Sequence, residues 1–386
     1  MTLADSLKPK RRDEKRRDSR AFLTVAVTLV IQDEIIRGTE CRNISSSGML
    51  ITVDNEIEVG KKGTVTLTKR CDDRFLTFSA ECQVTRFEKL ENGPCIGVTF
   101  TSMSPHDTES LAQIVDYHVC LMYREKILFD ESKIKGITLK IADTKDEFEQ
   151  AFRLLHDMYV NQGFMHPHPS GMRISLHNAA PFTIVIVAKI KDKVILTTSL
   201  YVDSFLGIPA DSTFREEIGT LRAQGRYFGE VGSLAAHPDS RSTDATLQLH
   251  MQKMILLYSI NYLKLDDLII TVICKHQSYY RHILLLQTIG EAKCYSSAND
   301  TPVIPMRLSL ENVQQRYSNA YKFFPPERKL DDFIFHKQSD CILLPSEKKP
   351  VQIWNKDLVD YFLRQKTNIL EESDPKKVVR ILGYYT

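Results

Sequence analysis

Residues 38–55 read GTECRNISSSGMLITVDN, in which three serines and a glycine separate two segments of β-strand character. A polar break of this kind is typical of a turn that joins two strands. Short strand-like runs with polar breaks continue from residue 20 to about residue 100, and Asn92-Gly93 is a second hairpin signal. The spacing therefore predicts a small antiparallel barrel or sandwich in this part of the chain.

A helix is expected to follow the predicted barrel. Residues 104–107, Ser-Pro-His-Asp, supply start signals, and residues 109–125 carry apolar side chains at helical spacing. Residues 119–137 are expected to complete this helix and link it to a second domain. With 386 residues, the chain is long enough for two or three domains.

Beyond residue 138, apolar strand-like runs alternate with helical patterns, the first of which has Asp143 or Thr144 as its N-cap candidate. Further helices are expected over 245–264 and 278–289. This alternation predicts an α/β domain with a mixed sheet over 138–325, followed by a C-terminal tail with one helix over 326–386. The predicted fold class is two-domain α+β, with an antiparallel β-barrel first and an α/β domain second.

Charge and composition narrow the function classes. The net charge of +2 argues against a generic nucleic-acid binder. No apolar run is long enough to cross a membrane, and the N-terminus lacks the pattern of a signal peptide. The eight cysteines form no CxxC pair, so we expect reduced core residues and a cytoplasmic protein.

The positive charge is concentrated in a basic arm, residues 1–20, which contains KRRDEKRRDSR. Arg16 and Arg20 have the spacing RxxxR, with Arg17 beside them, and Arg20 directly precedes the first predicted strand. Arg12 and Arg16 have the same spacing, so the register of the motif stays open by four residues. Such an arm is either a solvated flexible segment or a binding element, because arginine forks suit phosphate oxygens and guanine edges.

The serine turn contains a second motif, NxSxxG, made by Asn43, Ser45 and Gly48. Asn and Ser side chains can bond a base or ribose, and glycine permits close backbone approach. The motif by itself is equally compatible with a plain turn. Together with the preceding arginines it suits an anionic purine nucleotide.

The two motifs, in this order and at this distance, resemble those of the PilZ domain, a bacterial receptor module for cyclic di-GMP. The run CIGVTF, residues 95–100, is similar to the strand that closes the barrel of that family, and the resemblance covers residues 12–118. It implies that Arg16, Arg17 and Arg20 hold phosphates and guanine, while the loop residues contact the other guanine face. A PilZ barrel that does not bind nucleotide is the alternative.

In the second half, the stretch GRYFGEVGSLAAHPDSR, residues 225–241, carries a candidate for acid–base chemistry. Gly229 and Gly232 inside a strand pattern indicate a bulge or close approach by a ligand. Glu230 lies between them, as either a base with a raised pKa or the partner of an arginine. Tyr280, at the start of a predicted helix, is either a proton donor or a packing residue.

The same half resembles the N-acyl amino acid synthases (FeeM-type) within the GNAT acyltransferases. The matching elements are the turn GIPAD at 207–211, the helix end LRAQGR at 221–226, the strand EVGSLA at 230–235 and the segment 276–291. Similarity runs from about 138 to 320. The family resembles acyl-homoserine-lactone synthases in shape and transfers a fatty acyl group from acyl carrier protein to an amino acid amine.

The resemblance implies a role for each matching residue. Glu230 would be the base or orient the amine, the strand residues Ser233, Leu234, Ala235 and Ala236 would offer N–H groups to pantetheine and the thioester, and Tyr280 would lie near the thiol. Two departures are visible: the loop that cradles pyrophosphate in coenzyme A-using relatives is absent after Arg241, and Leu285-Leu286 replaces a Gly-Phe pair. The first departure favours a carrier-protein donor.

No metal site or cofactor is expected. His166 and His168 in FMHPHPSGM lack a third ligand at suitable spacing, so they are interpreted as part of a polar loop. In FeeM-type proteins this loop commonly helps to form the substrate pocket, and the two histidines are candidates for shaping amine specificity.

Two hypotheses result. In the first, cyclic di-GMP binds the barrel and regulates N-acyl transfer in the second domain. In the second, the GNAT-like half is a non-catalytic receptor that binds an acyl group or a partner protein. A homoserine-lactone synthase using S-adenosylmethionine is a third possibility, disfavoured by the match at residues 207–211.

Overall fold

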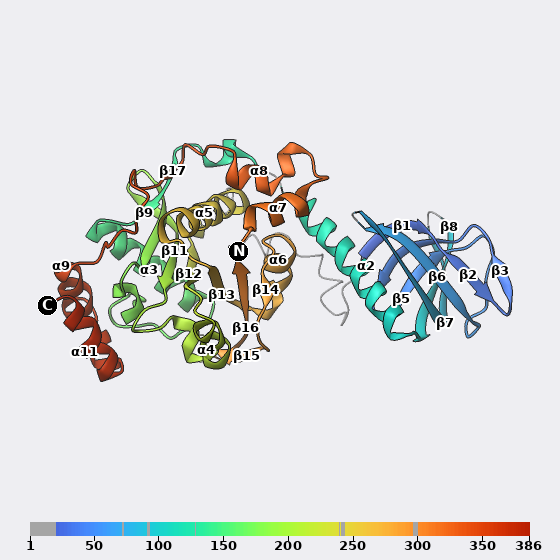
Figure 1. Ribbon diagram of the computed structural model, residues 1–386, viewed down its shortest axis with the longest axis horizontal. Coiled ribbons are helices and arrows are strands. Elements are labelled where there is room, and N and C mark those ends of the chain that lie inside the picture. Colours follow the sequence, from blue (N-terminus) through green and yellow to red (C-terminus); the bar gives the residue numbers. More distant parts are fainter. Residues whose placement is uncertain are drawn as a thin grey trace. The chain divides into compact units, whose positions relative to one another are not determined.

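The computed structural model describes residues 21–71, 73–90, 93–127, 129–238, 240, 244–295 and 300–386. The described chain forms two compact units, with the boundary between Ile127 and Leu128. Each unit is built on its own sheet (Figure 1).

The first unit is an antiparallel barrel, as predicted. Its sheet order is β1-β4-β5-β8-β7-β6-β2-β3. Because β1 and β2 are one run interrupted only at Val27, the pairing of β1 with β4 and of β2 with β6 closes the sheet on itself. The strands are β1 (Ala21–Ala26), β2 (Thr28–Ile31), β3 (Glu34–Ile36), β4 (Glu40–Ser45), β5 (Gly48–Thr52), β6 (Lys62–Cys71), β7 (Arg74–Leu90) and β8 (Gly93–Ser102).

Helix α2 (Pro105–Arg124) packs on this barrel and begins at the predicted signals. Ser104 is the N-cap, and its hydroxyl accepts the backbone N–H of Asp107 at 3.1 Å. The carboxylate of Asp107 in turn accepts the N–H of Ser79 in β7 at 2.8 Å. Apolar residues of the helix, including Leu111 and Ile114, belong to the barrel core. The cap and the apolar face therefore fix where the helix starts and which side it buries.

The second unit contains a mixed sheet in the order β14-β16-β13-β12-β11-β10-β9-β17, with β15 beside β16. Only β12–β13 and β9–β17 pair in parallel among the described strands. The strands are β9 (Ile137–Ile141), β10 (Ile184–Ile190), β11 (Lys193–Val202), β12 (Phe228–Ala236), β13 (Asp267–Ile273), β14 (Gln287–Thr288), β15 (Lys293–Tyr295), β16 (Thr301–Ser309) and β17 (Ile342–Leu343). The predicted mixed sheet is confirmed.

The helices of this unit are α3 (Lys145–Asn161), α4 (Arg215–Ala223), α5 (Asp244–Tyr258), α6 (Gln277–His282), α7 (Val313–Tyr321), α8 (Leu330–Phe335), α9 (Lys356–Val359), α10 (Ile369–Glu372) and α11 (Pro375–Tyr384). Thr144, not Asp143, caps α3. No helix in the described part of the chain is both long and apolar enough to span a membrane.

The helix expected over 278–289 is wrong in length. Helix α6 ends at His282, and Leu285 adopts a left-handed backbone with φ of 60°. The chain then turns into β14, which pairs with β16. The left-handed residue ends the helix because it breaks the series of i to i−4 hydrogen bonds, and it stands where the FeeM-type pattern has glycine.

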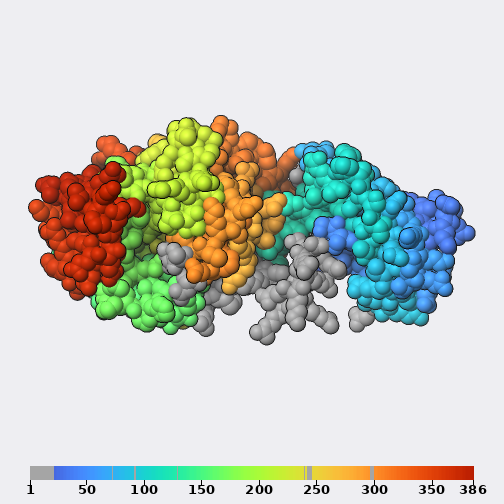
Figure 2. Space-filling model, turned by 90° about the horizontal axis from the view of Figure 1, so that it is seen from below, coloured from blue at the N-terminus to red at the C-terminus, as the bar shows by residue number. Residues whose placement is uncertain are grey.

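Residues 326–386, expected as a tail, instead complete the core of the second unit. Trp354, Phe362 and Ile381 are buried in the same apolar cluster as Phe148 and Phe152 of α3. The ring of Trp354 lies 5.7 Å from that of Phe148 and 5.7 Å from that of Phe362. In Figure 2 the end of the chain, coloured red, forms one continuous block of surface.

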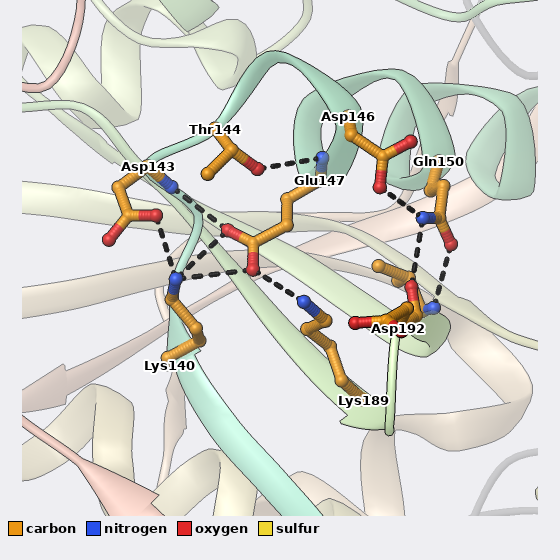
Figure 3. Close-up of polar contacts among 9 residues, drawn as sticks. Lys140, Asp143, Thr144, Asp146, Glu147, Gln150, Lys189 and Asp192 are labelled. Carbon is orange, nitrogen blue, oxygen red and sulfur yellow. Dashed lines mark hydrogen bonds and ion pairs between the residues drawn. The ribbon is translucent and has the colours of Figure 1, made fainter.

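A charged cluster joins the start of α3 to two strands (Figure 3). Glu147, which is 2% exposed, accepts Lys189 Nζ at 2.8 Å, Lys140 Nζ at 3.1 Å and the backbone N–H of Asp143 at 3.1 Å. Its own N–H donates to the hydroxyl of Thr144. Lys140 lies in β9 and Lys189 in β10, so one carboxylate holds the helix start to both strands.

We expect Glu147→Gln to lower the free energy of unfolding by about 2–4 kcal/mol at pH 7, because two partly buried lysines lose their counter-charge. Burial alone would raise the pKa of Glu147, but hydrogen bonds from Lys189, Asp143 N–H and Lys140 outweigh it and hold the pKa at about 2, below the usual 4.5. Ionised Glu147 therefore stabilises the fold above pH 4.5, and this contribution is lost as the pH falls toward 2. Urea denaturation of both proteins should show their difference shrinking from about pH 5 to about pH 3; an equal difference at both values would contradict this assignment.

Candidate functional site

The second unit has a cavity of about 470 Å³ over the middle of its sheet. It is walled by α3, by the segment 173–178 that follows the histidine-containing loop, and by strands β11, β12, β13 and β15. The polar side chains that reach it include Tyr159, Arg173, Asn178, Tyr201, Glu230 and Tyr295. A cavity with a few convergent polar groups is the usual form of a small-molecule site.

Glu230 is the carboxyl group of this cavity. It is 4% exposed and lies opposite Tyr201 across the β11–β12 ladder. Its oxygens accept the N–H of Ala210 at 2.7 Å and the hydroxyl of Thr271 at 3.4 Å. Burial raises the pKa of Glu230 to about 8, and these two hydrogen bonds only partly offset the effect. Among the described residues no arginine pairs with it, so the geometry favours the base over the ion-pair interpretation.

The turn GIPAD holds the hydrogen bond that positions Glu230. Gly207 has φ of 73°, and a Cβ there would lie 2.4 Å from the carboxylate of Asp211, so the position favours glycine. Asp211 accepts the N–H of Ile208 at 2.8 Å and thereby closes the turn. The closed turn presents Ala210 N–H to the carboxyl group of Glu230.

The helix-end motif LRAQGR carries two arginines that tie this region to the sheet. Arg222 makes bidentate pairs with both Asp203 and Asp211 at 2.6–2.9 Å. Arg226 pairs with Asp267 at the start of β13, at 2.7 and 3.0 Å. These two arginines therefore lie outside the cavity of Glu230 and hold the segments around it in place through ion pairs.

Strand β12 runs on past the point where its pairing with β13 stops. The parallel ladder ends at Val231↔Ile270, although β12 continues to Ala236. On the other edge the β11 ladder has a register shift between the pairs Thr197↔Ala235 and Ser199↔Gly232, which confirms the predicted bulge. The backbone of residues 232–236 thus does not pair with β13. A strand edge without such pairing can offer its N–H groups to a ligand.

The residues predicted to meet the acyl donor lie on this stretch. Ser233 has φ of 53° and its hydroxyl is 2.7 Å from that of Tyr201. Ser233 lines the cavity, whereas Ala235 is buried and Leu234 and Ala236 are half-buried. A left-handed serine is an uncommon backbone state, and such states concentrate at functional sites.

Tyr280 is half-buried on α6 and is not among the residues that line the cavity. Its ring packs edge-on against Tyr279, with centroids 5.1 Å apart. Burial raises the pKa of Tyr280 to about 12, and nearby Tyr159 adds to the shift. The phenol therefore carries its proton at neutral pH, the state that a donor needs.

The histidine-containing loop contacts α3 and the C-terminal segment, and its histidines do not reach the cavity. The N–H of His168 donates to His156 Nε2 at 3.0 Å, and the imidazole of His168 contacts Ser170 at 2.7 Å and Glu372 at 3.2 Å. Neither His166 nor His168 lines the cavity. Arg173, which follows this loop, does line it, with its guanidinium carbon 4.7 Å from the ring centre of Tyr159.

In the first unit, the motif NxSxxG lies on the hairpin between β4 and β5. Ser45 and Gly48 pair across its two-residue turn, and the hydroxyl of Ser45 contacts the carbonyl of Gly48 at 3.3 Å. A Cβ at Gly48 would come within 2.2 Å of the Val98 carbonyl in β8, so the glycine is required by close strand packing. Asn43 is half-buried and lies opposite Phe22 in β1.

The three arginines of the arm, Arg16, Arg17 and Arg20, lie outside the described residues. The strand that follows them begins at Ala21, which pairs with Ile44 one residue from Asn43. The start of β1 and the serine hairpin therefore lie at the same end of the barrel.

Comparison with known families gives a match for each unit. The family model for the PilZ domain matches residues 11–117, and that for the N-acyl amino acid synthase FeeM matches residues 150–309. The chain joins a PilZ domain to an acyltransferase domain of the FeeM type. Glu230 and the strand that carries it lie inside the FeeM match, and the NxSxxG hairpin lies inside the PilZ match.

Solved structures resemble each part. FeeM, an N-acyl amino acid synthase from uncultured soil microbes, is 22% identical over 46% of this chain and 93% of its own, with a TM-score of 0.42. The acyl-homoserine-lactone (AHL) synthase LasI is 12% identical over 45% and 90%, with a TM-score of 0.36. The PilZ domain of YcgR from Escherichia coli, solved with cyclic di-GMP, is 17% identical over 29% and 96%, with a TM-score of 0.24. A comparison with curated proteins found no match.

The FeeM-type domain has a second cavity of about 590 Å³ beside the first, and the two share His177, Pro209 and Ser212 in their walls. Arg215 and Lys377 give the second cavity its positive charge. Lys377 belongs to α11, beyond the segment that the family model matches. The C-terminal segment therefore helps to form a surface next to the candidate active site.

Sequence reasoning missed most of the cavity wall. Burial, followed by the positive charge of Lys377, lowers the pKa of His177 to about 4, and its Nε2 atom has no hydrogen-bond partner among the described residues. Tyr201 donates to or accepts from Ser233, and Asn178 contacts the same phenol at 3.5 Å. These residues come from distant segments without a shared motif, so no sequence signal marked them.

Proposed function

We propose that this chain is an N-acyltransferase that moves a fatty acyl group from acyl carrier protein to the amine of an amino acid, under the control of cyclic di-GMP bound by its PilZ domain. The observation that supports the transfer most directly is Glu230, a buried carboxyl group with a pKa raised to about 8, next to the stretch of β12 that does not pair with β13. FeeM, with which the second domain shares its family match, is an N-acyl amino acid synthase.

The proposed reaction balances with the groups present. The amine nitrogen attacks the thioester carbon while Glu230 accepts an amine proton. Backbone N–H groups of residues 233–236 stabilise the oxyanion, after which the carbon–sulfur bond breaks and the amide forms. The departing thiolate takes a proton, for which Tyr280 is the proposed donor, and the cycle closes when the phenolate regains a proton from solvent and Glu230 releases the amine proton to solvent. A carboxyl pKa near 8 suits proton transfer from an amine better than an ordinary glutamate does.

The carrier-protein donor is proposed from the sequence after β12. The glycine-containing loop that binds the pyrophosphate of coenzyme A is absent after Arg241. A donor that offers pantetheine without an adenosine pyrophosphate needs no such cradle.

The test incubates the purified full chain with an acyl carrier protein loaded with a fatty acid and a panel of amino acids, and follows N-acyl product by mass spectrometry. Product from the loaded carrier, with little from acyl-coenzyme A, is the expected result. Equal use of both donors would overturn the carrier assignment. Binding of the acyl carrier without turnover by any amine would instead favour a non-catalytic receptor.

For the PilZ domain, we expect wild-type protein to bind cyclic di-GMP and Arg16→Ala/Arg20→Ala to bind it at least about 100-fold more weakly. Two charge-assisted contacts at about 1.5–3 kcal/mol each account for a loss of this size. Isothermal titration measures it, and Arg12→Ala serves as the matched control for the register of the motif. Undiminished affinity in the double variant would remove these arginines from the site, and a loss in Arg12→Ala would shift the motif by four residues.

Control of catalysis is tested with the same reagents. Acyl transfer is measured with and without cyclic di-GMP in wild-type and double-variant protein. A nucleotide effect present in wild type and absent in the variant is the expected outcome. Identical rates throughout would leave two independent functions in one chain.

A further inference from the structure

The cavity that contains Glu230 has a second charged group. Among the described residues that line it, Arg173 is the one with a permanent positive charge. His177 lines it too, but its pKa of about 4 makes it neutral at pH 7. The cavity thus offers a carboxyl group from β12 and a guanidinium from the segment after α3.

Glu230 and Arg173 both influence two tyrosines of the cavity wall, Tyr159 and Tyr295. Burial is the main cause of the raised pKa values of Tyr159 and Tyr295, but both phenols also sense the charges. Glu230 raises each pKa, and Arg173 lowers each. Arg173 and Glu230 also line the same cavity of about 470 Å³, so a small ligand there can meet both a guanidinium and a carboxylate.

Arg173 is also held in a defined orientation. Its backbone N–H donates to the carbonyl of Phe152 in α3 at 3.1 Å, and its guanidinium lies over the ring of Tyr159 at 4.7 Å. Nη1 contacts the sulfur of Met165 at 3.5 Å. The N–H groups of a guanidinium form a planar fork that matches a carboxylate in a bidentate manner.

We infer that Arg173 binds the carboxylate of the acceptor while Glu230 receives its amine, and that Arg173 thereby restricts the acceptor to α-amino acids. The inference rests on the proposed acyl transfer and names how its acceptor is selected. An α-amino acid carries an amine and a carboxylate on one carbon, so it complements a base and a guanidinium that face one small cavity. A simple amine has no carboxylate for the guanidinium to bind, so it would bind without the same orientation.

The test compares an α-amino acid with the amine formed by its decarboxylation, each as acceptor for the same loaded carrier protein. Wild-type protein is expected to favour the amino acid by about 100-fold in kcat/KM, the worth of one bidentate charged contact. Arg173→Met should lose about 100-fold on the amino acid, mainly through KM, and leave the amine unchanged. Arg173→Lys keeps the charge without the fork and should fall between the two.

Lys377→Met is the matched control, because Lys377 is a cation of the neighbouring cavity. It should retain the preference for the amino acid. If Lys377→Met loses the preference and Arg173→Met keeps it, the acceptor carboxylate lies in the outer cavity and the inference is overturned. Equal losses by Arg173→Met on both acceptors would assign Arg173 a structural role instead.

A measurement on wild-type protein guards against a variant that fails to fold. An amino acid amide keeps the amine but lacks the negative charge, so it should be about 100-fold poorer than the amino acid. An amide that serves as well as the acid would overturn the inference while leaving the acyl transfer intact. If no acceptor is acylated, the proposed function fails by itself, and calorimetric binding of the amino acid to wild-type and Arg173→Met protein still decides the inference.

Discussion

Glu230→Gln is expected to lower kcat for acyl transfer by about 10²–10⁴-fold, the range that a general base contributes. Glutamine fills the same volume and can still accept the N–H of Ala210, but it cannot take a proton from the amine. In wild type, activity should rise with pH up to about 8, as the carboxyl group loses its proton. The variant should lose this part of the profile.

The same substitution is expected to stabilise the acyltransferase domain. Because the folded pKa of Glu230 lies above the ordinary 4.5, the folded protein holds a proton that the unfolded chain releases between pH 4.5 and about 8. The free energy of unfolding of wild type therefore falls as pH rises through this window, by an amount on the order of a few kcal/mol. Glutamine has no such dependence, so the Tm of the variant should exceed that of wild type increasingly toward pH 8.

Glu216→Gln on the exposed side of α4 is the matched control, and it should change neither rate nor stability. A Glu230→Gln variant with full activity would remove Glu230 from the mechanism. A variant that is inactive and also less stable at pH 8 would show that the carboxylate is structural. Gain of stability with loss of activity is the combination expected of a buried carboxyl group that serves the reaction and destabilises the fold.

Asp267→Asn is expected to destabilise the acyltransferase domain by about 3–5 kcal/mol, the largest structural effect that we predict. Asp267 is 0% exposed, and its carboxylate accepts Arg226 at 2.7 and 3.0 Å and Arg307 Nε at 2.7 Å. An amide has one oxygen and no charge, so two partly buried guanidinium groups would be left with a poor partner. Removing one member of such a group costs more than the group contributes by itself.

Urea denaturation of wild type and Asp267→Asn measures this loss, and Asp340→Asn at an exposed position is the matched control. A loss below about 1 kcal/mol would place Asp267 among ordinary surface ion pairs. Asp267 starts β13 and pairs with Phe228 at the start of β12. Phe228 lies two residues before Glu230 in the same strand. Partial unfolding there should therefore also reduce activity.

Local patterns in the sequence were sufficient for most of the architecture. The serine hairpin, the β-branched runs and the start signals at residues 104–107 predict the barrel and α2, and Ser104 caps that helix as expected. Gly229 and Gly232 singled out Glu230, and the register shift in β12 confirms the bulge. These features depend on neighbours in the chain, which propensity and periodicity describe well.

The ends of elements and the cavity walls were decided by tertiary contacts. A left-handed Leu285 ended the helix expected over 278–289, and packing of Trp354 and Phe362 on α3 turned a supposed tail into core. Both outcomes depend on residues far apart in the chain, which no window of sequence contains.

For this protein, sequence alone determined two domains, their families and the position of one buried carboxyl group, because each of these rests on a contiguous motif. Only the tertiary structure brought Arg173, Tyr159 and Tyr295 to the cavity of Glu230, and only it raised the pKa of that carboxyl group. The physical reason is desolvation, because burial among residues from separate segments raises the pKa of an ordinary glutamate to about 8.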